Sequence, residues 1–407
     1  MNRIVLIGLL VAILVGQLAL LSYLYFNQAI PADERRAVDQ AALRSLPGDF
    51  KIIESWLKEH AKTHDPRYTY DLLITTQLPP NIDLHLLGHT VGNLMYDQYG
   101  LDAMQYCTPD LRNACSHSVV VGALLDNGLA ALEDVHAACK KAPGGSGAYT
   151  MCFHGFGHGV LAFTEYDFDK AVALCQKVGT PEYQNEEAGQ CVGGAVMELR
   201  DGVHDRAMWE TKIASYINTD NPLGLCQRPS IFSEAKKHCY SYITPFLFDA
   251  AGANGGLPKV EHYAPAVAYC EKEPDSVFRE QCYAGFGKEF IVLAGSYDIQ
   301  HIDELPSEVL ATAASWCSTA STPDAVRACS LEIVHSLYWG GENNINGAIR
   351  YCSVLSNDLK EDCFSTLYSD VLAYQNEDHL RDVCALVPET EAESCTASGL
   401  KYNELSI

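Results

Sequence analysis

Residues 139–163 of this 407-residue chain read CKKAPGGSGAYTMCFHGFGHGVLAF, and this stretch decides the fold that we expect. Its two cysteines, Cys139 and Cys152, are separated by a glycine-rich turn. The second cysteine opens an apolar run that is long enough to form a helix. The same arrangement of a cysteine pair followed by an apolar run recurs along most of the chain, so the stretch is one example of a repeated unit.

The sixteen cysteines have a regular spacing that indicates this repeated unit. Within a pair the two cysteines are 8 to 16 residues apart, and successive pairs are separated by 21 to 35 residues. We expect each pair to form a disulfide, because a large, even cysteine set is typical of proteins that fold in an oxidising compartment. The expected bonds are Cys107–Cys115, Cys139–Cys152, Cys175–Cys191, Cys226–Cys239, Cys270–Cys282, Cys317–Cys329, Cys352–Cys363 and Cys384–Cys395.

The second cysteine of each pair serves as a reference position for aligning the repeats. It is followed by an apolar stretch of helical length, such as YAGFGKEFI after Cys282. A second segment, such as LAALEDVHAAC, then ends at the first cysteine of the next pair. In the first repeat Asp83 takes the place of the cysteine, so the reference positions fall 32 to 48 residues apart. Periods of this size are typical of helical-hairpin repeats.

The fold class that follows is all-α. We expect a helical-hairpin solenoid of about eight repeats, which could close towards an α/α toroid, with a disulfide joining each hairpin to the next. Alternating apolar and polar residues are scarce, which argues against strands. The expected domains are a transmembrane segment over residues 1–27, a stalk of juxtamembrane helices over residues 28–80, and the repeat domain over residues 81–400.

This arrangement resembles the cysteine-rich Sel1-like and tetratricopeptide solenoids, in which secreted helical hairpins are each stapled by a disulfide. The resemblance covers residues 81–400 and rests on architecture, since the Sel1 consensus with its Leu-Gly and Gly-x-Gly-x-x-x-Asp pattern is not evident. The C-x-H-G-x-G-H element at residues 152–158 also resembles uncharacterised exported microbial proteins. Neither resemblance implies an established activity.

The first residues of the chain predict a membrane anchor. Arg3 precedes the apolar stretch IVLIGLLVAILVGQLALLSYLYF, residues 4–26, which is long enough to cross a bilayer as one helix. Tyr23, Tyr25 and Phe26 lie where an interfacial aromatic belt is expected. A cleaved signal peptide is the alternative, but its apolar region is shorter, roughly 7–15 residues. We therefore expect a single-pass protein whose C-terminal domain is extracytoplasmic, either periplasmic or extracellular.

The chain is strongly acidic. Its 52 acidic and 28 basic residues give a formal net charge of −24, which argues against nucleic acid and an anionic membrane surface as partners of the repeat domain. A solvated acidic surface or cation binding fits this charge. No Walker phosphate loop, dinucleotide fingerprint, Gly-x-Ser-x-Gly or His-Glu-x-x-His motif is present, so these catalytic classes are also excluded.

Histidines recur at two fixed offsets from the reference position in the first three repeats. His85, His117 and His154 lie at offset +2, and His89 and His158 lie at offset +6. Offsets +2 and +6 are four residues apart, so each pair lies on one helix face. Because the first helices of neighbouring repeats lie side by side, we expect the five imidazoles to converge on the inner wall of the solenoid.

Converging imidazoles favour a metal site. Neutral histidine is the common nitrogen ligand of zinc, copper and iron, so we predict a divalent transition metal held by these five histidines. The membrane is the other expected partner, through the N-terminal helix. Two alternatives remain open: a hydrogen-bonded structural cluster, and a metal-free site for acid/base chemistry or anion binding.

Three further residues near the histidines are candidates. Asp83 is expected either to orient a ligand or to cap a helix. Glu165, eleven residues beyond His154, would share the helix face if the helix extends that far. Alternatively, Cys152 could join His154 and His158 in a thiolate–histidine zinc site, although an even cysteine set favours disulfides.

Later repeats carry other polar residues at the same positions. Offset +6 holds Lys288 and His335, and offset +7 holds Glu198 and Glu289. These residues could contact substrate on the same wall, but for Lys288 and Glu289 we favour ordinary surface charge. The remaining histidines of the repeat region share no offset, and none is assigned a role: His136, His204, His238, His262, His301 and His379.

These features support a membrane-anchored, extracytoplasmic helical-repeat protein with a histidine-rich transition-metal site. A metal with open coordination positions could make it an enzyme, either a hydrolase or an oxidase or oxygenase, although the sequence identifies no catalytic residue. The alternative is a scaffold without catalytic activity, whose concave face binds a peptide or a partner protein.

Overall fold

The computed structural model describes residues 32–79, 82–183, 185–202, 204, 206–216, 218, 220–299, 301–340, 344–374 and 377–405. The predicted transmembrane segment lies outside these residues. The described part is helical and contains no β-strand, which confirms the all-α prediction. The chain divides into two units, Met1–Leu46 and Pro47–Ile407, and helix α2 (Ala32–Arg44) is the described part of the first.

The second unit begins with helices α3 (Phe50–Thr63) and α4 (Pro66–Thr75), which pack on α5 (Leu84–Tyr99). In both α3 and α4, a side chain just before the helix fixes the position of the first turn. Asp49 accepts a hydrogen bond from a main-chain amide in the first turn of α3, and Asp65 does the same for α4, which has proline at its first position. The stretch predicted as a stalk therefore contains two capped helices that pack on α5, which carries His85 and His89.

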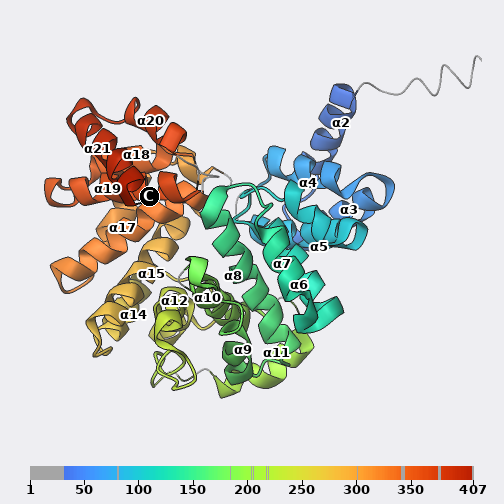
Figure 1. Ribbon diagram of the computed structural model, residues 1–407, viewed down its shortest axis with the longest axis horizontal. Helices are drawn as coiled ribbons and strands as arrows, with labels where there is room; N and C mark the ends of the chain where they lie inside the picture. The colour runs from blue at the N-terminus through green and yellow to red at the C-terminus, as the bar shows by residue number, and fades with distance from the viewer. Residues whose placement is uncertain are drawn as a thin grey trace, which may run out of the picture. The chain divides into compact units, whose positions relative to one another are not determined.

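Long helices containing or following the reference positions pack on one another in chain order (Figure 1). Each of them packs on the next, so the core is a continuous row of helix–helix contacts rather than one central cluster. After α5 they are α6 (Ala114–Asn127), α8 (Gly145–Phe163), α10 (Glu186–Asp201), α12 (Ser233–Tyr242), α15 (Ser276–Ala294), α17 (Pro323–Gly340), α19 (Asn357–Tyr374) and α21 (Glu389–Leu405).

Shorter helices connect the long ones, and most of them end at or near the first cysteine of a pair. These are α7 (Leu132–Cys139), α9 (Phe168–Cys175), α14 (Val260–Cys270), α16 (Ser307–Cys317), α18 (Asn346–Val354) and α20 (Glu377–Cys384). The remaining elements are α11 (Arg206–Lys212), α13 (Thr244–Phe248), a π-helical turn η5 (Asp249–Ala253), and the 3-10 helices η1 (Gly100–Tyr106), η2 (Gly128–Ala131), η3 (Pro181–Tyr183), η4 (Ile213–Ser215) and η6 (Ile302–Glu304).

All eight predicted disulfides are present, and no cysteine is free. Disulfide formation on this scale indicates an oxidising, extracytoplasmic compartment. The alternative of a thiolate–histidine zinc site is wrong, because the sulfur of Cys152 is bonded to Cys139. Each bond joins a connecting segment to the long helix that follows it, as the repeat alignment predicts.

Two glycines of α8 bring three long helices into close contact. A Cβ atom added at Gly155 would lie 2.4 Å from the Cα of His117 in α6, and one added at Gly157 would lie 1.9 Å from the carbonyl oxygen of Cys191 in α10. No other residue type fits at either position without moving a backbone. These glycines therefore set the distance at which the side chains of α6, α8 and α10 face one another.

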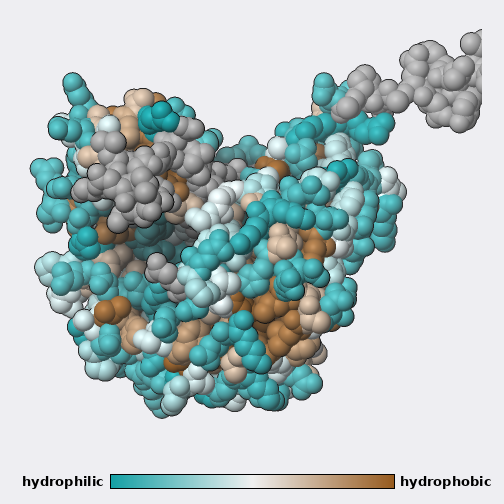
Figure 2. All heavy atoms as spheres, viewed as in Figure 1, coloured by the Kyte–Doolittle hydropathy of each residue, from teal (hydrophilic) through white to brown (hydrophobic). Residues whose placement is uncertain are grey.

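Within the described residues one helical stretch, Ala114–Cys139, is long and apolar enough to cross a membrane. It comprises α6, η2 and α7, and Gly128 interrupts it with a φ of 57°. Of its most apolar 18 residues, 56% are buried inside the domain, which is typical of a core segment. Hydrophilic side chains cover most of the molecular face shown in Figure 2.

Two contacts join helices that are far apart in the sequence. The hydroxyl of Ser146, at the start of α8, donates to the carbonyl of Ala373, at the end of α19. The guanidinium of Arg112, just before α6, lies 5.1 Å from the ring centroid of Trp339 in α17. Within the second unit, the late helices α17 and α19 therefore contact the segment before α6 and the start of α8.

Candidate metal centre

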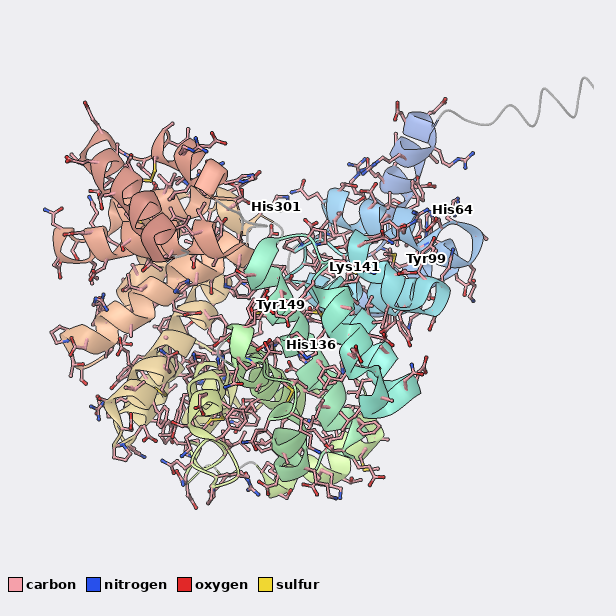
Figure 3. The ribbon with its side chains drawn as sticks, viewed as in Figure 1. His64, Tyr99, His136, Lys141, Tyr149 and His301 are labelled. Atoms are coloured by element: carbon pink, nitrogen blue, oxygen red, sulfur yellow. A yellow bond between two sulfur atoms is a disulfide. The ribbon has the colours of Figure 1, made fainter. Side chains whose placement is uncertain are left out.

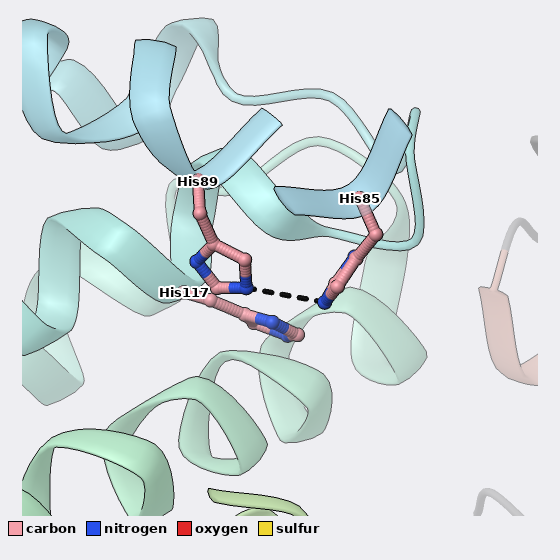
Figure 4. Close-up of side chains that lie close together, drawn as sticks. All are labelled: His85, His89 and His117. Atoms are coloured by element: carbon pink, nitrogen blue, oxygen red, sulfur yellow. Dashed lines mark hydrogen bonds between the residues drawn. The ribbon is translucent and has the colours of Figure 1, made fainter. Parts of the chain in front are cut away.

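The five predicted histidines meet where α5, α6 and α8 pack together. The ring centroids of His85 and His89 are 4.6 Å apart, and that of His117 lies 5.7 and 5.6 Å from them (Figure 4). His154 and His158 extend the group, with ring centroids 5.5 and 5.9 Å from His117. Convergence of the five rings is therefore observed, whereas metal binding stays a prediction.

His85 is held in one tautomer by the main chain. Its Nδ1 atom lies 2.7 Å from the carbonyl oxygen of Leu111, which can only accept a hydrogen bond. Nδ1 must therefore carry the proton. The Nε2 atom of a neutral His85 then carries a lone pair, which is available to a cation or to a hydrogen-bond donor.

His89 is held by a serine on the neighbouring helix. The hydroxyl of Ser118 donates its single proton to the carbonyl oxygen of His89, at 2.9 Å. The Nδ1 atom of His89, 3.0 Å from the same hydroxyl, is then the donor to it. His89 accordingly presents its Nε2 lone pair, and this atom lies 3.1 Å from Nε2 of His85.

A buried carboxylate in α10 fixes the other side of the cluster. Oε2 of Glu198 accepts from Nδ1 of His158 at 3.2 Å and from Nδ1 of His204 at 2.9 Å. Oε1 accepts from the Tyr166 hydroxyl at 2.6 Å and from the main-chain amide of His204 at 3.0 Å. Burial raises the pKa of Glu198, but the hydrogen bonds from the two histidines outweigh burial and hold it well below its usual range.

His158 and His204 also present their Nε2 atoms, because Glu198 accepts from both Nδ1 atoms. The Nε2 of His158 is buried and has no hydrogen-bond partner among the described residues. The ring of His204 lies 5.9 Å from that of His158 and 5.9 Å from that of His89. Histidines that bind metals usually have the other nitrogen hydrogen-bonded to a carboxylate or carbonyl, as these do.

Burial keeps the clustered imidazoles neutral. It lowers the pKa of His85 to about 4, although the Leu111 carbonyl opposes the shift. Burial, followed by repulsion from neighbouring histidines, holds the pKa values of His89, His117 and His154 well below their usual range. Neutral imidazole is the form that binds metal ions, so the cluster needs no proton release at neutral pH.

His117 and His154 have buried nitrogens that no described residue satisfies. Neither ring nitrogen of His117 has a hydrogen-bond partner among the described residues. Nδ1 of His154 likewise has no hydrogen-bond partner in the part of the chain that the structure describes, and the centroid of its ring lies 4.6 Å from that of Tyr242. A buried polar atom left unsatisfied costs about 1–3 kcal/mol, which a bound ligand would offset.

The ligand atoms fall into two adjoining groups. His85, His89 and His117 each offer a nitrogen, and these three atoms lie within 4.8 Å of one another. The second group, His158, Glu198 and His204, meets the same limit. In that group the oxygens of Glu198 already accept four hydrogen bonds. The arrangement therefore favours a carboxylate that orients the imidazoles of His158 and His204 over one that binds the metal itself.

The two acidic candidates lie outside these groups. Asp83 is exposed and caps α5, accepting from the amide of Leu86 at 3.0 Å, which confirms its interpretation as a helix cap. Helix α8 ends at Phe163, and Glu165 is exposed in a left-handed turn with a φ of 55°. The condition under which Glu165 was expected to share the helix face is not met, because the helix does not extend to it; the next residue, Tyr166, contacts Glu198 instead.

His204 is the functional candidate that the repeat alignment missed. It lies beyond the end of α10 and therefore shares no offset with the other histidines. Gly202 ends that helix with a φ of 61° and turns the chain back, so that both the amide and the ring of His204 reach Glu198. A glycine closing a helix, followed two residues later by histidine, is the sequence signal that could have indicated it.

A cavity of about 640 Å³ adjoins the cluster. Tyr242, which packs on His154, is part of its wall, as are Lys288 and His335. Our expectation of ordinary surface charge at Lys288 is wrong: its side chain is 12% exposed, pairs with Glu289 at 2.7 Å and lies 4.7 Å from the Tyr242 ring. Other charged and aromatic residues of the wall are Glu182, Glu186, Lys237, His238, Glu332, Asp370, Tyr183 and Trp339.

Other histidines outside the cluster have local partners. His136 of α7 is bonded at 2.9 Å to the hydroxyl of Tyr149 in α8, and that hydroxyl donates to Glu187 (Figure 3). His301, labelled in the same figure, pairs with Asp298 at 3.1 Å. These histidines have polar partners, whereas in the cluster some buried nitrogens of His117, His154 and His158 have no hydrogen-bond partner among the described residues.

Three comparisons with known proteins add no family to this description, since no protein-family model, no curated protein and no solved structure matches the chain.

Proposed function

We propose that this protein is an extracytoplasmic helical-repeat protein whose function depends on a transition metal bound in the histidine cluster. In this proposal residues 1–27 anchor the chain in a membrane, and the following disulfide-stapled hairpins form a solenoid. The metal ligands are the imidazoles of His85, His89 and His117, together with those of the adjoining His158 and His204.

The orientation of the imidazoles is the observation that carries the proposal. In four histidines Nδ1 is committed as a donor, to Leu111, to Ser118 or to Glu198, and Nε2 is left as a lone pair. Neutral histidines packed for structure alone would pair a donor with an acceptor. Here acceptors face acceptors across a buried space, which a cation would stabilise.

The donor set selects the kind of metal. It consists of imidazole nitrogens, which suit zinc, copper, iron and nickel, whereas magnesium and calcium prefer oxygen ligands. The three nitrogens of His85, His89 and His117 can hold one ion. In the second group the third residue is Glu198, so a second ion bound by His158 and His204 alone would need further ligands from outside the chain. We therefore expect up to two ions per chain.

An enzymatic role, as a hydrolase or as an oxidase or oxygenase, would use this site. A bound metal with open positions supplies Lewis acidity or binds oxygen, depending on its identity. The protein's own part is to hold the imidazoles neutral, to exclude water by burial, and to orient His158 and His204 through Glu198. The neighbouring cavity is the route by which a substrate would reach the site.

Metal analysis of the purified full-length protein tests the proposal. We expect stoichiometric zinc, copper or iron, with about one ion lost in His85→Ala/His89→Ala and about one in His158→Ala/His204→Ala. The double variant His136→Ala/His301→Ala is the matched control and keeps its metal, because these residues lie outside the cluster. Wild-type protein that contains no metal, takes none up and keeps its melting temperature in chelator would contradict the proposal.

A scaffold without catalysis is the second candidate, and the polar cavity favours it. A wall that mixes acidic, basic and aromatic side chains suits a peptide or a protein segment as well as a small substrate. In a pure scaffold the histidines would hydrogen-bond in pairs: the Ser118 hydroxyl would donate to Nδ1 of His89, and Nε2 of His89 would donate to Nε2 of His85. Unchanged ligand binding after removal of all metal, with no turnover, would support this candidate.

A further inference from the structure

A closed ring of helices surrounds the cavity. Helices α8, α10, α12, α15, α17 and α19 pack on one another in chain order, and α19 also packs on α8. At this junction the hydroxyl of Ser146 in α8 donates to the carbonyl of Ala373 in α19. Side chains from every helix of the ring line the cavity of about 640 Å³, so the cavity lies inside the ring rather than between two neighbouring repeats.

The charged side chains of the cavity wall are neutralised within the protein. Ion pairs that each contain a wall residue join nitrogen to oxygen at 2.7 to 3.1 Å: Lys140–Glu182, Lys237–Glu186, Lys288–Glu289 and His335–Asp370. A further carboxylate of the wall, Glu332, is attracted by the charges of His335 and Lys288. A charged ligand would lose its hydration here without gaining an unpaired counter-ion. The wall therefore favours a ligand that carries no net charge.

The uncharged part of the wall is polar as well. Met151 and Ala373 are the aliphatic side chains among the described residues that line the cavity. Most small-molecule sites have a mainly hydrophobic lining, so a wall with so few aliphatic groups suits a ligand rich in hydrogen-bonding groups. Hydroxyl groups fit best, because each can donate to a carboxylate and accept from a lysine or an amide. The wall supplies hydroxyl and amide groups of its own from Ser146, Thr150, Ser241, Gln190 and Gln281.

Two aromatic rings give this polar wall flat apolar surfaces. Trp339 and Tyr183 line the cavity, and both are half-buried. The guanidinium of Arg112 lies 5.1 Å from the centroid of the Trp339 ring, and the ring centroid of Tyr183 lies 4.3 Å from that of Tyr149. A neighbouring side chain thus holds each ring in place, and the rest of the ring is available to a ligand. The C–H face of a sugar ring packs on such a surface while its hydroxyl groups reach polar side chains.

We propose that the cavity binds a neutral disaccharide or trisaccharide, with a sugar ring packed on the indole of Trp339 and its hydroxyl groups hydrogen-bonded to the polar wall. The volume of about 640 Å³ lies in the range of sites for small organic ligands. A lipid lacks the hydroxyl groups that the wall requires, and a free peptide carries two terminal charges that the wall does not balance. This inference goes beyond the proposed function, because sugar binding in the ring requires no metal.

Calorimetry of the full-length protein tests the ligand class with three neutral trisaccharides: maltotriose, cellotriose and the trimer of N-acetylglucosamine. We expect at least one of them to bind with a dissociation constant below about 1 mM. The cationic trimer of glucosamine and the anionic trimer of galacturonic acid should bind at least about tenfold more weakly, because the wall offers no unpaired counter-ion. Failure of all three neutral sugars, or tighter binding of trialanine or of a charged trimer, would overturn the proposal.

Variants of Trp339 test the contact with the sugar ring. Trp339→Leu removes the flat ring and should weaken binding of the best sugar at least about tenfold, whereas Trp339→Phe keeps a ring and should stay within about threefold of wild type. Trp209→Leu is the matched control, because Trp209 also packs on an arginine, 4.0 Å from Arg206, but outside the cavity wall. Unchanged binding in Trp339→Leu would exclude Trp339 as the recognition residue.

Tryptophan fluorescence of the wild type gives a second readout, which holds even if Trp339→Leu does not fold. The chain has four tryptophans, and a sugar packed on Trp339 should change the emission of the wild type but not that of Trp339→Phe. Sugar binding that leaves the wild-type emission unchanged would contradict the contact with Trp339.

Measurements with and without metal separate this inference from the metal proposal. We expect the same affinity for the sugar before and after treatment with chelator, because the wall residues that bind it lie outside the histidine cluster. Sugar binding by a protein that takes up no metal would leave this inference standing and refute the metal proposal. Stoichiometric metal without sugar binding would do the reverse.

Discussion

The Nε2 atoms of His85 and His89 lie 3.1 Å apart, and the hydrogen bonds to Leu111 and Ser118 leave both atoms without a proton. Two lone pairs at this distance repel each other. The pair is stable if a cation lies between them, or if the Ser118 hydroxyl donates its hydrogen bond to Nδ1 of His89, so that the single ring proton of His89 lies on Nε2. The first arrangement is a metal site and the second a structural cluster, so the protonation of His89 distinguishes the two.

Replacing Glu198 should weaken metal binding although Glu198 is not itself a ligand in our proposal. In Glu198→Gln the amide NH2 takes the place of one oxygen, where it faces either the two Nδ1 donors of His158 and His204 or the main-chain amide of His204, so the four hydrogen bonds cannot all persist. We expect metal affinity to fall about 10- to 100-fold. Glu187→Gln is the matched control: Glu187 is equally buried in α10 but bonds Tyr149 and Thr180 instead. Competition with a calibrated chelator measures both affinities, and equal losses in the two variants would contradict the assignment.

A methyl group at Gly155 should disturb the cluster through packing alone. The added Cβ atom would lie 2.4 Å from the Cα of His117, so α6 and α8 must move apart. We expect Gly155→Ala to reduce the free energy of unfolding by about 1–3 kcal/mol and to lower the metal content. Gly48→Ala serves as the control, since its nearest contact would be an ordinary 3.4 Å from Pro79. Denaturant unfolding and metal analysis check the result; a stable Gly155→Ala variant with full metal content would refute it.

Disulfides at the two ends of the repeat domain should differ in their effect on the site. Removing Cys139–Cys152, which closes a loop of 13 residues, should lower stability by about 3 kcal/mol and also release metal, because Cys152 lies two residues before His154. Removing Cys384–Cys395, with a similar separation of 11 residues, should destabilise the last repeat but leave the metal bound, since repeats contact mainly their neighbours. Thermal unfolding and metal content of the two alanine double variants measure this, and metal loss in both would indicate that the domain unfolds as one unit.

The His335–Asp370 pair predicts a loss of stability at alkaline pH. Burial lowers the pKa of His335, but the charge of Asp370, the hydrogen bond to it and the charge of Glu332 outweigh burial and raise the pKa to about 9. An unfolded histidine has a pKa of about 6.5, so the stabilisation is complete below that value and is lost as the pH rises through 9. Melting temperatures of wild type should fall over this range more than those of Asp370→Asn, and parallel profiles would contradict the pairing.

The cysteines show how far sequence reasoning could go. Their spacing alone predicted every disulfide and the reference positions of the helices, because a disulfide joins residues that are close along the chain at each junction. The same alignment placed five histidines on facing helix surfaces. It could not place His204, whose position depends on a turn after α10. It also could not decide whether Glu165 shares the helix face, because no residue in that stretch marks the end of α8 at Phe163.

The sequence by itself determined the all-α class, the disulfide pairing and the oxidising compartment, because each depends on local periodicity or on cysteine number. Tertiary structure alone decided which side chains complete the site. Glu198 accepts hydrogen bonds from two imidazoles, and Arg112 lies over Trp339 although more than two hundred residues separate them in the sequence. The physical reason is that hydrogen-bond partnership and burial depend on distances between helices, and these are set by the close packing of α6, α8 and α10 at their glycines.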